Sequence, residues 1–197
     1  MTTLGRYFES TLADAPAFDL PFNALPGVDQ KTFIRTNIPA WACTSDLAAT
    51  GTGVAIGTRV FLRKGDVVTN LAFVAGNTAL ATGTAGWHAL YDPDGNKLAQ
   101  SAAQGATAWA ANTARKLALT APYTITADGF YIVATSTTAS TVQTLIGAAP
   151  IVTASAIVAG SQSKAMGFTF GSATGDTAPS TTGTQTGVAK CPLAIVT

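Results

Sequence analysis

Few residues of this chain could carry out chemistry. His88 is the only histidine and Glu9 is the only glutamate among the 197 residues. A catalytic triad needs an acid that orients the histidine, and no acid stands at a suitable spacing from His88. Glycoside hydrolysis needs two carboxyl groups, which a single glutamate near the N-terminus does not provide. We therefore expect no catalytic residue and no enzyme, with His88 as a structural residue of a strand.

Two other patterns resemble metal or redox sites. Residues 92–96 read DPDGN and begin like a calcium loop, but the later glutamate ligand is missing and a hairpin turn explains the same residues. Cys43 and Cys191 show neither the C-x-x-C nor the Cys/His spacing of metal sites. They flank the predicted β-domain, and the sequence leaves open whether they form a disulfide or remain two free buried thiols. We expect no metal and no cofactor.

Aromatic side chains offer binding rather than catalysis. Several could form a platform on which a sugar ring stacks, although the core of a β-domain is the usual place for most of them. They are Trp87, Tyr91, Trp109, Tyr123, Phe130 and Tyr131. Trp41 and Trp109 lie outside the predicted strands. These two are therefore our candidates for surface or interface aromatic residues.

The composition indicates an ordered chain with a surface that is poor in charge. Hydrophobic residues make up 47% and charged residues 11%, against a usual charged share of about 25%. Small uncharged residues make up the difference, which indicates that much of the surface is buried in an assembly. The net charge is +1 without a basic cluster, so we expect no nucleic acid. Neither a long apolar span nor a signal-peptide pattern occurs, so we expect synthesis in a cytoplasm and no membrane insertion.

From residue 57 onward, apolar and polar residues alternate with the period of two that is typical of β-strands. We predict strands over residues 58–63, 67–74, 86–92, 97–101, 114–120, 129–135, 163–170 and 188–196. Turn sequences rich in Pro, Gly, Asn and Asp stand between several of them. The predicted fold is all-β, a single antiparallel β-sandwich of jelly-roll or immunoglobulin-like type over residues 46–197. The Ser/Thr/Gly tract at 171–187 is predicted to be an exposed loop or a hairpin tip.

Six residues are predicted to contribute to the core or to its inter-sheet and subunit borders: Trp87, Leu90, Leu117, Leu119, Phe130 and Ile132. Trp87 and Leu90 point to opposite faces of a regular strand, so either a bulge or burial on both faces must occur between them. The stretch from residue 129 to residue 163 contains no charged side chain. This favours burial of the stretch between subunits.

Residues 1–45 differ from the rest of the chain in their pattern of proline and apolar residues. Four prolines between positions 16 and 39 exclude a long helix or a central strand. Apolar residues nevertheless recur, and an extended segment cannot bury them on itself. Either the segment packs on its own domain, or it is an extended N-terminal arm that docks on a neighbour. We favour an arm for attachment or subunit exchange, with the anchors Phe8, Phe18, Phe22, Phe33 and Trp41.

Several short segments form one pattern along the chain. They read VVTNLAFVAG (67–76), WHALYD (87–92), GNKLAQS (95–101), AWAANT (108–113), KLALTAPYTI (116–125) and GFY (129–131). This pattern resembles a β-sandwich module of structural proteins from tailed phages that infect actinobacteria, and the resemblance covers residues 44–146. Proteins with that module are described as minor tail, fibre or head-decoration components. The resemblance implies no catalytic residue, and it does not extend to the N-terminal segment.

The resemblance and the charge-poor surface together predict a non-enzymatic structural protein of the virion. The favoured role is a capsid decoration (cement) protein on the particle exterior, with the major capsid protein or tail proteins of the same virion as partners. We also expect a homo-oligomer, and a trimer is the working hypothesis because capsid surfaces offer local threefold points. One alternative is a minor tail or tail-tip protein that contacts the host surface and binds a glycan. Another is a free carbohydrate-binding module of a bacterium.

Overall fold

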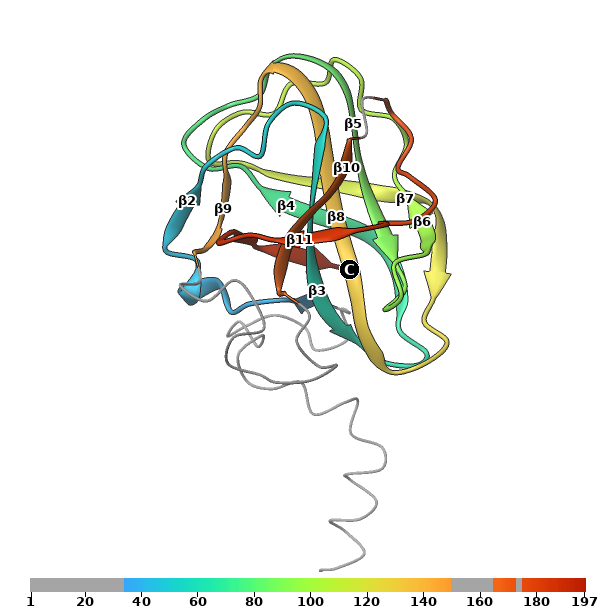
Figure 1. The fold of residues 1–197 in the computed structure, drawn as a ribbon. Helices are drawn as coiled ribbons and strands as arrows, with labels where there is room; N and C mark the ends of the chain where they lie inside the picture. Colours follow the sequence, from blue (N-terminus) through green and yellow to red (C-terminus); the bar gives the residue numbers. More distant parts are fainter. Residues whose placement is uncertain (1–33, 150–164, 173–174) are drawn as a thin grey trace, which may run out of the picture. The chain divides into compact units, whose positions relative to one another are not determined.

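The computed structural model describes residues 34–149, 165–172 and 175–197, which form a β-domain (Figure 1). Within these ranges the regular structure is strand, apart from one 3-10 turn, η2 (Ala40–Ala42). The strands are β1 (Arg35–Thr36), β2 (Ser45–Leu47), β3 (Val54–Leu62), β4 (Val67–Val74), β5 (Ala81–Tyr91), β6 (Lys97–Gln100), β7 (Ala114–Thr124), β8 (Gly129–Thr141), β9 (Leu145–Ala148), β10 (Gly167–Ser172), β11 (Gln185–Gly187), β12 (Cys191–Pro192) and β13 (Ala194–Val196). The predicted all-β class is confirmed.

Two antiparallel sheets pack against each other. The larger sheet has the strand order β11-β10-β3-β8-β5-β6 and the smaller has the order β1-β13-β4-β7. In Figure 1, β4 runs across the direction of β3 and β8, so the two sheets cross rather than align. A third sheet, β12-β9-β2, is joined to the smaller one by a bridge between Ala75 and Leu145. The predicted antiparallel β-sandwich is confirmed.

The strand pairs show how the chain reaches this arrangement. β1 pairs with β13, β3 with β8, β4 with β7 and β5 with β6, so four antiparallel pairs are nested within one another along the sequence. One long hairpin with its tip at residues 92–96, rolled into two sheets, gives this set of pairs. That plan is a jelly roll, so the structure selects between the two sandwich types that the sequence left open. The first and last strands of the domain are neighbours.

The larger sheet is buried on both of its faces. Leu90 of β5 faces the smaller sheet and belongs to the main core. Trp87 of the same strand faces outward and packs with Phe168 and Phe170 of β10. Burial on both faces, and not a bulge, therefore reconciles the opposite orientations of Trp87 and Leu90. Of the other residues predicted for the core or its borders, Leu119 and Ile132 are buried and Leu117 is half-buried, whereas Phe130 is exposed and therefore lies outside the core.

The Ser/Thr/Gly tract is fastened to the outer face of the larger sheet. Ala178 is buried there, its N–H donates to Oε1 of Gln100 (3.1 Å), and its carbonyl accepts from the Lys97 ammonium (2.7 Å). Thr182 is buried as well, and residues 185–187 form β11. The prediction of an exposed loop is wrong for Ala178 and Thr182, although most other described residues of the tract are exposed. Because β11 pairs with β10, the tract belongs to a hairpin, which is the other alternative that the sequence left open.

Small residues of the sheet make room for this covering segment. A Cβ atom at Gly57 would lie 2.9 Å from the Phe168 ring, so glycine at this position leaves room for that ring. The Arg59 guanidinium lies over the same ring, 4.9 Å from its centroid, and donates from Nη2 to Gln185. Arg59 thereby ties β10 and β11 to β3. Packing of this kind gives the larger sheet a second, smaller core.

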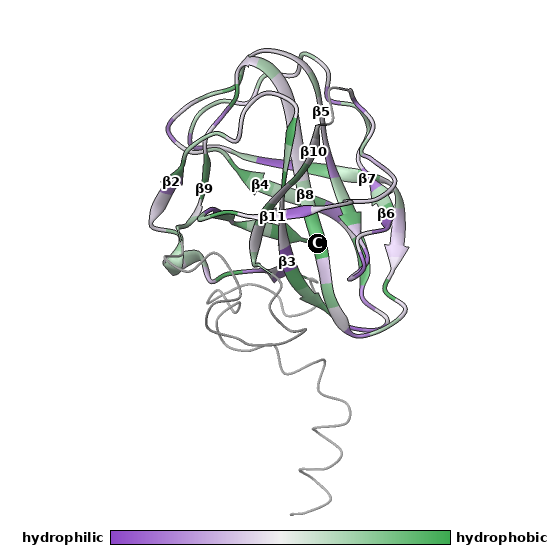
Figure 2. Ribbon diagram, in the orientation of Figure 1, coloured by the Kyte–Doolittle hydropathy of each residue, from purple (hydrophilic) through white to green (hydrophobic). Residues whose placement is uncertain are grey.

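The position of β8 accounts for much of the charge-free stretch. β8 lies between β3 and β5, and residues 131–137 are all buried. Figure 2 shows hydrophobic residues along β3 and β8 and hydrophilic residues in the turns at the lower edge. A central strand that is buried on both faces has no place for a charge. Burial within the domain, and not between subunits, therefore explains these residues, while residues 150–163 lie outside the described part.

Truncation on either face of the larger sheet is expected to destabilise the domain. Leu90→Ala on the inner face should cost about 2–5 kcal/mol and Phe168→Ala on the outer face about 3–5 kcal/mol, because both side chains are fully buried. Phe61→Ala is the control, since this residue of the same sheet is partly exposed and should lose about 1 kcal/mol or less. Urea unfolding measures all three. A Phe168→Ala variant as stable as the control would show that the outer face is not a core.

Candidate functional site

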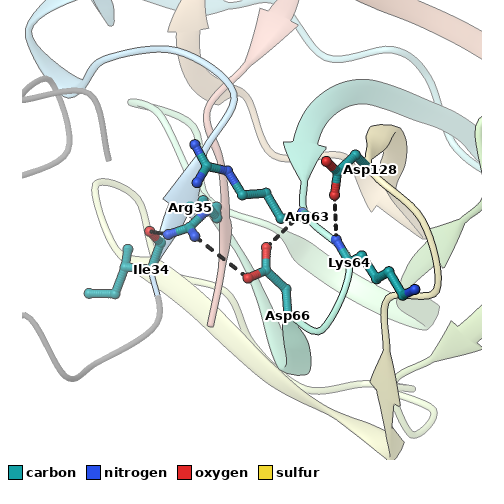
Figure 3. Close-up of polar contacts among 6 residues, drawn as sticks. All are labelled: Ile34, Arg35, Arg63, Lys64, Asp66 and Asp128. Carbon is teal, nitrogen blue, oxygen red and sulfur yellow. Dashed lines mark hydrogen bonds and ion pairs between the residues drawn. The ribbon is translucent and has the colours of Figure 1, made fainter. Parts of the chain in front are cut away.

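Residues 34–37, which we call the N-terminal base, are held to the rest of the β-domain by backbone and side-chain contacts (Figure 3). β1 pairs with the last strand, β13, residue for residue. Nη2 of Arg35 lies 3.6 Å from Oδ1 of Asp66, and both side chains are mostly buried. The second oxygen of Asp66 accepts a hydrogen bond of 2.8 Å from the backbone N–H of Arg63. Because a turn holds the carboxylate in place, the ion pair fixes the start of the domain to one point.

Asn37 adds a second fastening next to the first. Its Nδ2 donates to Oγ1 of Thr58 and to the carbonyl of Pro192, both at 2.8 Å. Its Oδ1 accepts from the N–H of Ala194, also at 2.8 Å. One amide side chain therefore connects the N-terminal base to β3, β12 and β13. The hydrogen-bonding capacity of this half-buried amide is used almost fully.

The predicted arm of residues 1–45 has to be shortened. β1, η2 and β2 belong to the β-domain, and the compact unit begins at Phe33. The sequence signal failed because strands of two or three residues show no alternation and Pro39 interrupts only the link between them. The anchors Phe8, Phe18, Phe22 and Phe33 lie outside the described residues, so their role stays a prediction. Trp41 lies on η2, and its side chain is 72% exposed.

The prediction of Trp109 as a surface aromatic is wrong. Its side chain is only 2% exposed and belongs to the main core. Its Nε1–H donates to the carbonyl of Thr113 at 3.0 Å, and the Arg115 guanidinium lies 4.5 Å from its ring centroid. Trp109 stands outside the regular strands but bridges to Leu80. The absence of an alternating pattern around a residue therefore did not indicate exposure.

His88 lies in the core beside Trp109. Its Nδ1 is 3.1 Å from the carbonyl of Trp87 and its Nε2 is 3.3 Å from the carbonyl of Arg115. Burial lowers the pKa of His88 to about 4, although both carbonyl contacts act to raise it. The neutral ring can donate to only one of the two carbonyls. A ring without solvent access or a neighbouring acid has a structural role, as the sequence predicts.

The two cysteines are free thiols. Of the two alternatives that the sequence left open, the structure therefore favours free thiols over a disulfide. Cys191 is buried, and Oγ1 of Thr58 lies 3.5 Å from its sulfur. Cys43 is half-buried and lies 3.6 Å from the carbonyl of Pro39. Burial, together with the Cys191 thiol, raises the pKa of Cys43. Burial likewise raises the pKa of Cys191, so neither thiol is activated as a nucleophile.

The DPDGN run forms the hairpin turn between β5 and β6. Oδ1 of Asp92 accepts the N–H groups of Asp94 (2.9 Å) and Asn96 (2.8 Å), and Oδ2 accepts the Asn96 amide at 2.8 Å. Burial acts to raise the pKa of Asp92, but these hydrogen bonds outweigh it and hold the pKa below its ordinary value. Among the described residues, no group of three or more His, Cys, Asp or Glu side chains could hold a metal ion.

Three apolar side chains remain exposed at one end of the larger sheet. Phe61 of β3 and Phe130 of β8 stand directly opposite each other and are 43% and 53% exposed. Met166, which directly precedes β10, is 39% exposed. We call these three residues the aromatic surface. Sequence reasoning missed it, although Phe61 alternates with two core residues, Val60 and Leu62, and must therefore face outward.

Other features of the described part give no further site. A crevice beside β2 and β9 encloses about 10 Å³, close to what one water molecule needs. Within the described ranges, no helix has the length and hydrophobicity to cross a membrane. A scan of family models and searches of curated proteins and of solved structures found no match to this chain. The surface features, and above all the N-terminal base and the aromatic surface, are what the domain offers to a partner.

The stability of the domain is expected to fall in mild acid because of His88. Its pKa is about 4 in the folded chain and about 6.5 in the unfolded chain. Below pH 6.5 the unfolded chain therefore binds a proton that the folded chain does not. Urea unfolding should show a loss of about 2 kcal/mol between pH 7 and pH 5. His88→Gln removes the titrating group and is the control, and an equal loss in this variant would contradict the assignment.

Asn37→Ala is expected to destabilise the domain by about 2–3 kcal/mol, because it removes the partner of the Ala194 N–H and of the Thr58 hydroxyl. Asn77→Ala is the matched control, since Asn77 is exposed and its loss should change stability by less than about 0.5 kcal/mol. Thermal unfolding followed by circular dichroism measures both variants. Equal melting temperatures would show that Asn37 does not fasten the N-terminal base.

Proposed function

We propose that this chain is a non-enzymatic structural protein of a bacteriophage particle and that it decorates the capsid exterior. The observation that carries the proposal is the fastening of residues 34–37 to β3 and to the last strands. A segment that attaches a protein to a particle needs a fixed point at its base, and the Arg35–Asp66 ion pair with the Asn37 hydrogen bonds supports such a point. The resemblance over residues 44–146 and the jelly-roll plan support the same proposal by analogy.

The chemistry of the described residues agrees with a structural role. His88 and Trp109 are buried in the main core, and Arg115 lies over the Trp109 ring. The Tyr91 hydroxyl donates to the carbonyl of Pro179 at 3.2 Å, and burial raises the pKa of this side chain. Groups that elsewhere act in catalysis thus serve packing in this domain. In the proposed role the chain is made in the host cytoplasm and resides in the virion, without nucleic acid as a partner.

In this proposal, residues 1–33 bind the major capsid protein through separate apolar anchors. Phe8, Phe18 and Phe22 are spaced too widely for one helix face and are separated by proline. Pockets on the particle would accept them one at a time, and each buried Phe contributes about 1.5–3 kcal/mol. Charges in the segment are sparse and of both signs, so attachment should depend only weakly on salt.

A second candidate is a minor tail or tail-tip protein that contacts the host surface. One observation favours it: the Trp41 side chain is 72% exposed on η2, and an exposed indole stacks well on sugar rings. The number of copies per virion separates the two candidates. A decoration protein is present in hundreds of copies and a tail-tip protein in a handful. Quantitative mass spectrometry of purified virions measures this number, and absence from the virion would contradict both.

The full chain with Phe8→Ser, Phe18→Ser and Phe22→Ser is expected to bind undecorated particles at least about a hundredfold more weakly than the unchanged chain, because three buried anchors are lost. The control carries Thr2→Ala, Ser10→Ala and Asn23→Ala in the same segment and should bind normally. Co-sedimentation with particles measures both. Equal binding of the two variants would show that the N-terminal segment does not attach the protein.

A further inference from the structure

The aromatic surface is the part of the outer sheet face that the described residues leave uncovered. Elsewhere on this face, Trp87, Tyr91 and Ile132 are buried in a cluster with Ala178 of the Ser/Thr/Gly tract and with the Phe168 and Phe170 side chains of β10. The rings of Phe61 and Phe130 touch each other edge to face, with centroids 5.3 Å apart. Gly167 of β10 pairs with Thr58 of β3, so the antiparallel register places Met166 beside Arg59, two positions before Phe61. Phenylalanine and methionine side chains in such a cluster are typical of the central part of a protein interface.

Two opposite charges lie at one end of this surface, in the turn after β3 and the turn before β8. Lys64 follows Phe61 by three positions, and Asp128 precedes Phe130 by two. The backbone N–H of Lys64 donates to Oδ1 of Asp128 at 2.7 Å, so the two turns are held together. Figure 3 shows the Lys64 side chain extending away from the Asp128 carboxylate. Both side chains are exposed, and within the described residues neither forms an ion pair.

We propose that the aromatic surface is a two-fold interface at which a second copy of this chain binds. In a two-fold interface the same patch meets itself, so the patch must be complementary to itself. An aromatic pair with one cation and one anion at one end meets this condition when the two-fold axis passes beside the two turns, because Lys64 of each copy then faces Asp128 of the other. The proposal does not depend on the virion role, and it replaces the trimer expected from the sequence with a dimer.

The size of the patch sets the expected strength of the dimer. A stable interface buries roughly 800 Å² on each partner, which is more than three partly exposed side chains supply. The turns at residues 63–66 and 126–128 must therefore join the contact, and these turns carry the two charges. Such an interface is at the small end of the range. We expect a dissociation constant on the order of 10 μM and a fast exchange between monomer and dimer.

Sedimentation velocity of the full chain from micromolar to millimolar concentration tests the proposal. Phe61→Ser and Phe130→Ser are each expected to weaken dimerisation at least about tenfold. Trp41→Ser is the matched control, because it removes an exposed aromatic side chain outside the surface and should leave the dimer unchanged. Circular dichroism confirms that each variant keeps its fold. Since both phenylalanines are exposed, neither change should unfold the domain.

Charge reversal tests the orientation of the two copies. Lys64→Asp places acids against acids in its own dimer, and Asp128→Lys places cations against cations, so each variant alone should be monomeric. When the two variants are mixed, both contacts pair opposite charges, and a heterodimer should form. Lowering the salt concentration should strengthen this heterodimer. Failure of the mixture to associate, while the unchanged chain dimerises, would overturn the two-fold arrangement.

Three other results would overturn the proposal itself. The first is a chain that stays monomeric over the whole concentration range, and the second is a trimer. The third is an association that survives both Phe61→Ser and Phe130→Ser but is lost with Phe8→Ser, Phe18→Ser and Phe22→Ser. That result would assign the contact to the N-terminal segment. The copy number in the virion is a separate measurement, so failure of the dimer and failure of the virion role can be told apart.

Discussion

The need to bury both faces of the larger sheet is the constraint on which the rest of the structure depends. A hairpin rolled into a jelly roll covers only the inner face, with the smaller sheet. The outer face is covered by described residues of the Ser/Thr/Gly tract and by the Phe168 and Phe170 side chains of β10, which is itself a strand of this sheet. Glycine at position 57 leaves room for the Phe168 ring. A tract that looks like a linker in the sequence is therefore part of the packing.

The same constraint also places polar side chains in the interior of the domain, away from the surface. Lone polar side chains such as His88 and Arg115 are placed among aromatic rings, where their hydrogen bonds go to backbone carbonyls. Two of the buried positively charged side chains, Arg59 and Arg115, lie over the rings of Phe168 and Trp109. A ring face offers a cation a favourable contact without a buried acid. What remains outside is a charge-poor surface suited to association with other proteins.

Much of the fold could be predicted from the sequence, because long strands with one buried face alternate clearly. The predicted strand at 67–74 coincides with β4, and the other long strands differ from the structure mainly at their ends. The short strands β1, β2, β9 and β11 were missed, since two to four residues carry no period. The jelly-roll order was not predictable either, because it depends on pairs far apart in the sequence, such as residues 35 and 196.

The candidate site was less predictable than the fold. Trp109 was placed at the surface because the residues around it do not alternate, whereas a hydrogen bond to Thr113 and the Arg115 cation fix it in the core. For Phe130 the sequence left open the core and its inter-sheet and subunit borders, and strand parity excludes the core by setting this side chain outward beside Phe61. Asn37 gave no signal, since an amide between prolines and apolar residues resembles any loop residue. Its role depends on Thr58, Pro192 and Ala194, which only the fold brings together.

The pairing of β1 with β13 also has a mechanical consequence. Tension applied through the N-terminal segment enters the domain at residues 34–37 and meets the Arg35–Asp66 pair and the Asn37 hydrogen bonds first. From there the load passes into β3 and β13, two strands that are held by neighbours within their sheets. A pulled chain would have to break these side-chain bonds together, since they share one short stretch of backbone. The contacts of residues 34–37 would therefore bear a force applied to the N-terminal segment, and they would have to break before the strands of the two sheets separate one after another.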